Sequence, residues 1–140
     1  MSSSAEVQAA ELHSVIERFN ALSECAIRAV GAGDEIALAA ALDARDLLTK
    51  RAGTLSAALS AARRAAPDLA TRKLIDTLLH PAQRSAQTAA SLNADLTARA
   101  QSARDDIRAQ LDRLTHDDAA RAAYSSAAFR GDDQHFDSKR

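Results

Sequence analysis

Two short interruptions divide this 140-residue chain into three segments, and each segment repeats apolar residues at the spacing of an α-helix. The interruptions are Gly31-Ala32-Gly33-Asp34 and Ala66-Pro67-Asp68. Within each segment, leucine and alanine recur every three or four residues, which places them on one face of a helix. The sequence has no alternating β-branched run and no Asn-Gly hairpin turn. We therefore predict an all-α fold: a long antiparallel helical hairpin or three-helix coiled-coil-like bundle.

The interruptions also predict where the helices begin and end. The first helix is expected over residues 5–30 and the second over residues 34–65. Gly31 is suited to the left-handed conformation that ends a helix, and Asp34 is suited to cap the next one. The short connection makes these two helices antiparallel neighbours.

The third helix is expected to start at Pro67, because proline fits the first turn, where its missing N–H is not needed. Pro81 then predicts a kink or short break at His80. The helix is expected to fade near Asp117-Asp118, because two carboxylates oppose the negative end of the helix dipole.

The aromatic residues indicate how the chain is divided. Three of the four, Tyr124, Phe129 and Phe136, lie in a polar stretch beyond the helical pattern, whereas a helical domain normally buries its aromatics in the core. We predict a helical domain over residues 1–118 and a flexible or short-helical tail over residues 119–140. The tail aromatics act as binding anchors, form a fourth helix that folds back, or have no role.

Composition limits the classes of function. The 18 basic and 19 acidic residues are intermixed and give a net charge of −1, so no nucleic-acid or membrane-surface partner is expected. No apolar run approaches the length of a membrane span. The lone Cys25 forms no disulfide within the chain, and we expect a cytoplasmic protein without membrane insertion.

No catalytic motif is present, and we predict neither an enzyme nor a cofactor. Gly31 and Gly33 lack the rest of a phosphate-binding loop. The four histidines do not have the spacing of a helical metal site, and we expect them to be solvated surface residues. The four histidines are His13, His80, His116 and His135.

Two polar residues fall on or beside the predicted apolar seams. Arg45 lies between Leu42 and Leu48, and Asn93 lies next to Leu92. Arg45 either lays its stem on the seam with its charge in water, or makes an interhelical bond that fixes register. Asn93 raises the same question, because one polar group near a seam selects register.

Several short motifs resemble one family. The segment Leu42-Asp43-Ala44-Arg45-Asp46-Leu47-Leu48 precedes a long helix with Leu92-Asn93-x-x-Leu96, and the tail contains Ala-Ala-Tyr124 and ends Phe136-Asp137-Ser-Lys-Arg. Over residues 41–140 the chain resembles the FlgN/FliT type of flagellar type III export chaperone. The resemblance implies a cytoplasmic, non-catalytic helical protein that holds the C-terminal helices of hook-associated or filament-cap subunits before export.

The predicted binding residues follow from the leucine pattern and from this resemblance. A thin, alanine-rich bundle leaves apolar stripes partly uncovered, and an amphipathic client helix fits such a groove. We predict that leucines of the third helix line this groove. The resemblance further implies that Tyr124 docks on an export-gate protein, although a typical Tyr-Gly is here Tyr124-Ser125. The predicted groove residues are Leu74, Leu78, Leu92, Leu96 and Leu111.

Two other classes of function compete with the chaperone. In the first, the apolar seams close on each other in a structural coiled-coil homodimer that has no client. In the second, the chain is a small helical signalling domain in which His80 or His116 accepts a phosphoryl group. A protease-sensitive tail and binding of an apolar helix distinguish the chaperone from a closed dimer.

Overall fold

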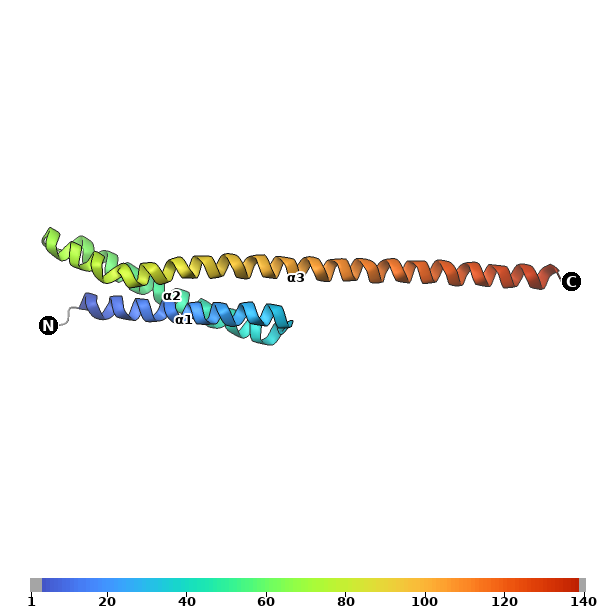
Figure 1. Ribbon diagram of the computed structural model, residues 1–140, viewed down its shortest axis with the longest axis horizontal. Helices are drawn as coiled ribbons and strands as arrows, with labels where there is room; N and C mark the ends of the chain where they lie inside the picture. The colour runs from blue at the N-terminus through green and yellow to red at the C-terminus, as the bar shows by residue number, and fades with distance from the viewer. Residues whose placement is uncertain (1–3, 139–140) are drawn as a thin grey trace. The chain divides into compact units, whose positions relative to one another are not determined.

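The computed structural model describes residues 4–138 of the chain, with side chains described as far as residue 127. Three helices account for nearly all of it: α1 over Ser4–Ala32, α2 over Glu35–Ala65 and α3 over Leu69–Ser138 (Figure 1). Residues 4–138 contain no β-strand. The predicted all-α fold with three helices is therefore confirmed.

The chain divides into two units, Met1–Ala100 and Gln101–Arg140. The first unit contains α1, α2 and the first part of α3. The second unit is the remainder of α3, and within residues 101–127 every side chain except that of Ala103 is exposed. The predicted boundary at residue 118, as a limit between a folded domain and a flexible tail, stays a prediction.

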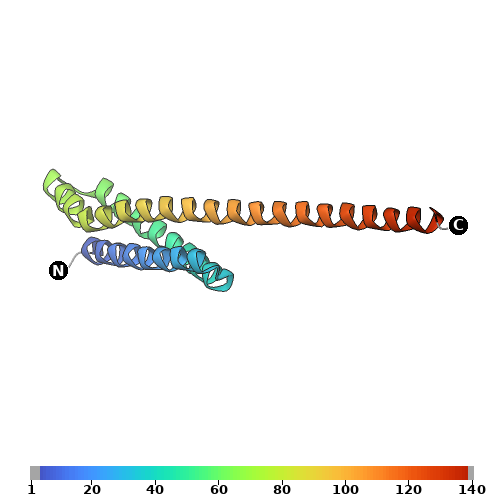
Figure 2. The ribbon, with the colours of Figure 1, turned by 45° about the vertical axis from the view of Figure 1, so that its right-hand side comes forward.

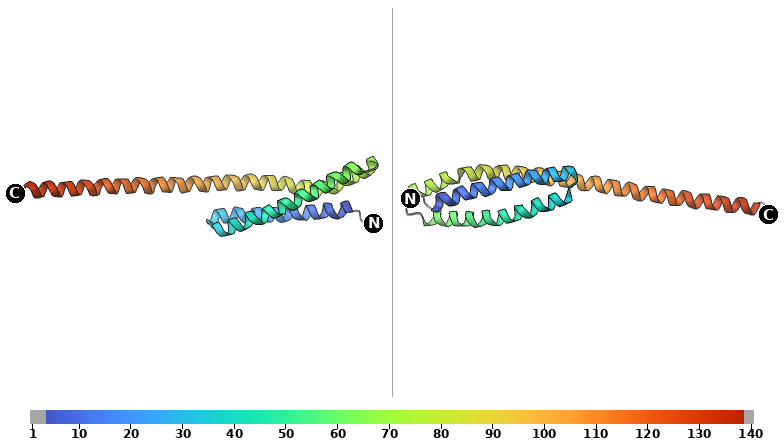
Figure 3. Two further views of the ribbon diagram at one scale, coloured as in Figure 1. Left: turned by 180° about the vertical axis from the view of Figure 1, so that it is seen from behind. Right: turned by 90° about the horizontal axis from the view of Figure 1, so that it is seen from below.

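In the first unit consecutive helices run in opposite directions, so that α2 is antiparallel to both α1 and α3 (Figure 2). The view from below places α1 between the ribbons of α2 and α3 (Figure 3). The bundle buries apolar side chains of all three helices in one cluster, which contains Leu12, Val15, Leu55, Leu59 and Ala82. A second, smaller cluster joins Ala26, Ala41 and Leu96.

The turn between α1 and α2 uses a different glycine from the one predicted. Gly33, at φ 67°, adopts the left-handed conformation, and Gly31 remains in the helix. The Asp34 N–H donates to Ala29 O at 2.9 Å and the Gly33 N–H donates to Val30 O at 3.2 Å, which is the Schellman pattern of helix ends. Asp34 then caps α2, because its Oδ1 accepts from the Ala37 N–H at 3.0 Å.

Two predictions about α3 are wrong. The helix starts at Leu69 and not at Pro67, with the Asp68 Oδ1 accepting from the Thr71 N–H at 2.8 Å. It also continues through Pro81 without a break at His80, whereas the kink that was the other form of this prediction is not contradicted: the first part of α3 bends away from the direction of the rest (Figure 2). A proline inside a helix removes one backbone hydrogen bond and clashes with the preceding turn, which together cost about 3 kcal/mol. The buried side chains on both sides of the proline offset that cost by holding the helix against α1 and α2.

The end of α3 also differs from the prediction. The helix does not fade at Asp117-Asp118 but continues to Ser138, so residues 119–138 extend α3 and do not form a separate fourth helix. The side chains of Phe129 and Phe136 lie outside the described residues. Tyr124 lies within them and is 79% exposed.

Candidate functional site

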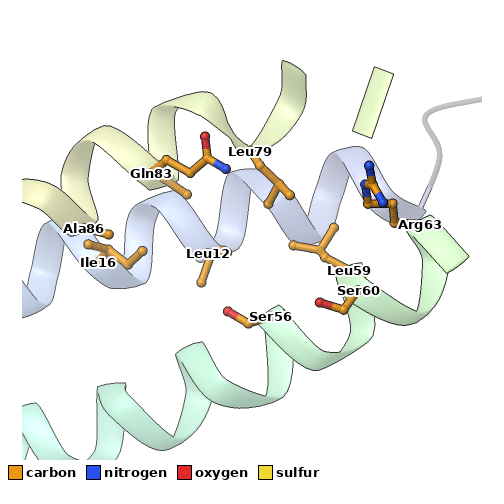
Figure 4. A pocket seen from close by; sticks show the side chains of 10 residues that line it. Leu12, Ile16, Ser56, Leu59, Ser60, Arg63, Leu79, Gln83 and Ala86 are labelled. Atoms are coloured by element: carbon orange, nitrogen blue, oxygen red, sulfur yellow. The ribbon is translucent and has the colours of Figure 1, made fainter. Parts of the chain in front are cut away.

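An apolar groove lies between α2 and α3 of the first unit, and α1 forms its floor. It consists of two adjoining hollows with volumes of about 280 and 170 Å³. Ile16 and Ala86 line both hollows, so the groove is continuous. The larger hollow is lined by Leu12, Ile16, Ser56, Leu59, Ser60, Arg63, Leu79, Ala82, Gln83 and Ala86 (Figure 4). Val15, Ile16, Phe19, Leu48, Thr49, Ala52, Ala86 and Ala89 line the smaller one.

The groove exists because small side chains face each other across it. Ala52 and Ser56 stand on the α2 wall, and Ala82 and Ala86 stand on the α3 wall. Helices pack closely when large side chains of one fill the spaces of the other. Ala52, Ser56 and Ala86 are too small to fill the gap, so the apolar floor at Ile16 stays partly open.

Each end of the groove is bridged by a polar contact between α2 and α3. At one end Arg63 Nε lies 2.8 Å from Asp76 Oδ1. Hydrogen bonding to Arg63 holds the pKa of Asp76 below its ordinary value, and the same bond raises the pKa of Arg63. At the other end Arg45 Nη2 donates to Asn93 Oδ1 at 3.0 Å. The two walls are therefore tied together on both sides of the opening.

The contact between Arg45 and Asn93 brings together the two polar residues that the sequence placed at the seams. Arg45 also lies over the Phe19 ring, with its guanidinium carbon 4.4 Å from the ring centre, a geometry that favours a cation–π attraction. Its Nε is buried and has no hydrogen-bond partner among the described residues. Arg45 thus makes an interhelical hydrogen bond, and its role in setting register stays a prediction.

The five leucines predicted to line the client groove do not lie together. Leu96 is 7% exposed and belongs to the second core cluster, and Leu78 packs against the first. Leu74 is 51% exposed but lines neither hollow, and Leu92 is half-buried outside both. Leu111 belongs to the second unit. Leu78 and Leu96 thus help to pack α3 against α1 and α2, and the role of the five leucines in client binding stays a prediction.

A polar cluster between α1 and α3 was missed by the sequence interpretation. Ser85 is buried on α3, and its hydroxyl donates to Glu17 Oε1 and lies 3.2 Å from His13 Nδ1. The buried Asn20 donates from Nδ2 to Ser85 O at 3.0 Å, while its Oδ1 has no partner among the described residues. His13 is therefore half-buried and not a solvated surface residue.

This cluster joins α1 to α3 through hydrogen bonds. The Ser85 hydroxyl donates to Glu17 Oε1, and the direction of its contact with His13 Nδ1 is set by the tautomer of the imidazole. The spacing of His13, Glu17 and Asn20 on one helix face was the sequence signal for a shared partner.

The two histidines considered as phosphoryl acceptors lie on the surface of α3. His80 and His116 are exposed on α3, and His80 lies near Gln83, Arg84 and Gln87 around a shallow surface hollow. No group of three or more candidate metal ligands occurs among the described residues. Within residues 4–138, none of the helices is both long enough and apolar enough to cross a membrane.

Comparison with models of protein families, with curated proteins and with solved structures finds no match for this chain. The groove between α2 and α3 therefore carries the functional argument.

Proposed function

We propose that the chain binds an amphipathic helix of a partner protein in the groove between α2 and α3. The observation that carries this proposal is the continuous apolar opening over Ile16 and Ala86, which three helices leave without a fourth. An amphipathic helix buries its apolar face in such a groove and completes a four-helix arrangement. The groove has one charged lining residue, Arg63, so burial of apolar area is the main driving force.

The dimensions of the opening suit a helix. Arg45 and Arg63, which mark its two ends, are 18 residues apart on α2, a length of about 27 Å at 1.5 Å per residue. A partner helix of about 18 residues spans the same distance. Apolar residues at positions i, i+4 and i+7 of that helix reach one face and enter the two hollows in succession.

We further propose that the chain is an export chaperone of the FlgN/FliT type. It would act in the cytoplasm, without catalysis or a cofactor. The supporting observations are the motifs given above and an apolar groove suited to the C-terminal helices of hook-associated or filament-cap subunits. Tyr124 supports the export-gate part of the proposal, because it is exposed and free to contact a second protein. In this proposal the client lies on the first unit and the gate contacts the second.

Two peptides test the helix-binding proposal directly. The first is a labelled 18-residue amphipathic helix with leucines at positions i, i+4 and i+7, and the second has the same composition in an order without a stripe. We expect the first to bind the full chain and the second not to bind, as measured by fluorescence anisotropy. Equal binding of both peptides, or of neither, contradicts the proposal.

A pair of variants locates the binding. Ala86 lines both hollows, whereas Ala90 lies one turn further along α3, is exposed, and lines neither. Ala86→Gln is expected to weaken binding of the striped peptide at least tenfold because it fills the groove with a polar side chain. Ala90→Gln is the matched control and is expected to bind as the natural chain does. Glutamine suits both positions because it is a good helix former.

The flagellar part has its own test. Purified C-terminal segments of hook-associated and filament-cap subunits are titrated against the full chain, with an unrelated helical segment as control. Tight binding of one subunit class, lost in Ala86→Gln, supports the chaperone. Tyr124→Ala is expected to retain that binding and to lose binding to the export-gate protein. Failure of all flagellar segments, together with binding of the striped peptide, leaves a helix-binding protein with another client.

A further inference from the structure

The two hollows of the groove differ in polarity. The smaller hollow has a single polar lining residue, Thr49, whose hydroxyl donates to Arg45 O at 2.9 Å, so this hollow presents apolar side chains to a partner. The larger hollow has four polar lining residues, all on the α2 and α3 walls. A partner helix therefore meets an apolar half and a polar half along the groove. The four polar residues are Ser56, Ser60, Arg63 and Gln83.

Arg63 is the charged member of the polar half. It lies near the C-terminal end of α2, at the edge of the larger hollow (Figure 4). Its guanidinium has five N–H groups, and two of them, on Nε and Nη2, bond Asp76. The other three have no partner among the described residues. The side chain of Arg63 is 50% exposed, so one edge of the guanidinium is open to a ligand.

A carboxylate is the group that best fits an open guanidinium edge. The planar guanidinium presents parallel N–H donors, and its bonds to a carboxylate are stronger than those between neutral groups. Asp76 repels a second carboxylate, but it occupies a different edge of Arg63 and is itself about half exposed, so the repulsion is screened by water and salt. The charge of Arg63 thus complements an acidic partner.

The spacing along α2 defines where this carboxylate lies in a partner helix. Ala52 lines the smaller hollow only, and Arg63 lies 11 residues further along α2, about 16.5 Å at 1.5 Å per residue. Eleven residues are close to three whole turns, so position i+11 of a helix returns to the face of position i. A partner helix with an apolar anchor beside Ala52 therefore brings position i+11 to Arg63.

We propose that Arg63 selects amphipathic helices that carry an aspartate or glutamate at position i+11, counted from the apolar anchor beside Ala52. The apolar anchors supply most of the affinity, and Arg63 decides which helices are accepted. It also sets their direction, because a carboxylate on the C-terminal side of the anchors makes the partner run parallel to α2. This inference rests on the proposed function, since it concerns the same helix in the same groove.

Two labelled 18-residue peptides of identical composition and charge test this requirement. Both have leucines at positions i, i+4 and i+7. The first has glutamate at i+11 and glutamine at i+9, on the opposite face, and the second exchanges these two residues. Fluorescence anisotropy with the full chain at low salt is expected to show about threefold or more tighter binding of the first peptide, as for an exposed ion pair. Equal binding of the two peptides by the natural chain overturns the inference.

Variants of the chain assign the preference to one side chain. Arg63→Gln is expected to bind the two peptides equally. Arg51→Gln is the matched control and is expected to keep the preference, because Arg51 is also in a half-exposed ion pair on α2 but lines neither hollow. Asp76→Asn removes the competing carboxylate and is expected to widen the preference, a change that loss of folding cannot produce. A preference that survives in Arg63→Gln, disappears in Arg51→Gln or is not widened in Asp76→Asn overturns the inference.

Failure of this inference is distinguishable from failure of the proposed function. The peptide with glutamine at i+11 keeps the apolar stripe, so it reports binding to the groove without the carboxylate. Equal binding of both peptides that is weakened by Ala86→Gln overturns the role of Arg63 and retains the helix-binding function. Failure of both peptides to bind the natural chain overturns the helix-binding function itself.

Discussion

Arg45 on α2 donates a hydrogen bond from Nη2 to Asn93 Oδ1 on α3 at 3.0 Å. The same guanidinium lies over the Phe19 ring of α1. One side chain therefore contacts all three helices of the first unit at the end of the groove. Because the hydrogen bond pairs one position on α2 with one on α3, we predict that it favours a single antiparallel register of these two helices over neighbouring ones.

The first prediction concerns the energy of this contact. A double-mutant cycle with Arg45→Ala and Asn93→Ala is expected to give a coupling free energy of about 0.5 to 1.5 kcal/mol, the range of a typical hydrogen bond. Urea unfolding measures it. The Arg51–Glu11 ion pair, with Nε 2.8 Å from Oε1, is the comparison. Both partners of that pair are about half exposed, so a coupling of about 1 kcal/mol or less is expected there. A coupling free energy of zero between Arg45 and Asn93 would contradict a role of their hydrogen bond in setting the register.

Much of the fold follows from residues that act locally. The helical segments, the break at Gly31-Ala32-Gly33-Asp34 and the cap at Asp34 depend on neighbours in sequence, and the structure has them close to where they were expected. Spacing alone does not decide whether Gly31 or Gly33 adopts the left-handed conformation, because the two glycines lie within one turn of each other. Pro81 does not break α3, because tertiary packing holds the helix together on both sides of it.

The groove between α2 and α3 depends on how the helices face each other, and the sequence pattern of one helix does not show this. A stripe on one helix identifies the apolar face but not which part of it another helix covers. Leu96 and Leu74 belong to the same apolar pattern of α3, yet one is in the core and the other is exposed. The groove could have been predicted only by comparing two helices. Ala52 on α2 and Ala86 on α3 are both small and lie at facing positions of two antiparallel helices.

The second prediction compares a core leucine with an exposed one on the same helix. Leu59 is the largest fully buried side chain of the chain's described part, and Leu47 is exposed. Leu59→Ala is expected to lower the free energy of unfolding by about 2 to 5 kcal/mol, through lost burial and the cavity left behind. Leu47→Ala is expected to change it by less than about 0.5 kcal/mol. Chemical denaturation measures both, and similar losses would contradict the packing of α2 described above.

The third prediction concerns the buried amide of Asn20. Asn20→Asp removes the donor to Ser85 O and places a carboxylate beside that carbonyl and near Glu17. A loss of about 2 to 4 kcal/mol at neutral pH is expected, because a buried charge without a partner is costly. Asn20→Leu has a similar size and also removes the unpartnered Oδ1, so a smaller loss is expected. Equal losses in the two variants would show that charge burial is not the cause.

The last prediction uses pH to test the bridge between Arg63 and Asp76. The hydrogen bond from Arg63 lowers the pKa of Asp76 from its ordinary value of 3.8. An acid whose pKa is lower in the folded state contributes stability that is fully present above the unfolded value. That contribution is lost as the pH falls through the folded value. Asp76→Asn removes it, so the variant is expected to be less stable than the natural chain at pH 7.

The difference between Asp76→Asn and the natural chain is expected to shrink steadily as the pH is lowered below about 4, where the natural carboxylate also becomes protonated. Thermal unfolding followed by circular dichroism at several pH values measures this convergence. Asp106→Asn is the control, because Asp106 is exposed in the second unit and has no ion pair among the described residues. A difference between Asp76→Asn and the natural chain that stays constant from pH 7 to pH 3 would show that the bridge at this end of the groove does not stabilise the fold through the charge of Asp76.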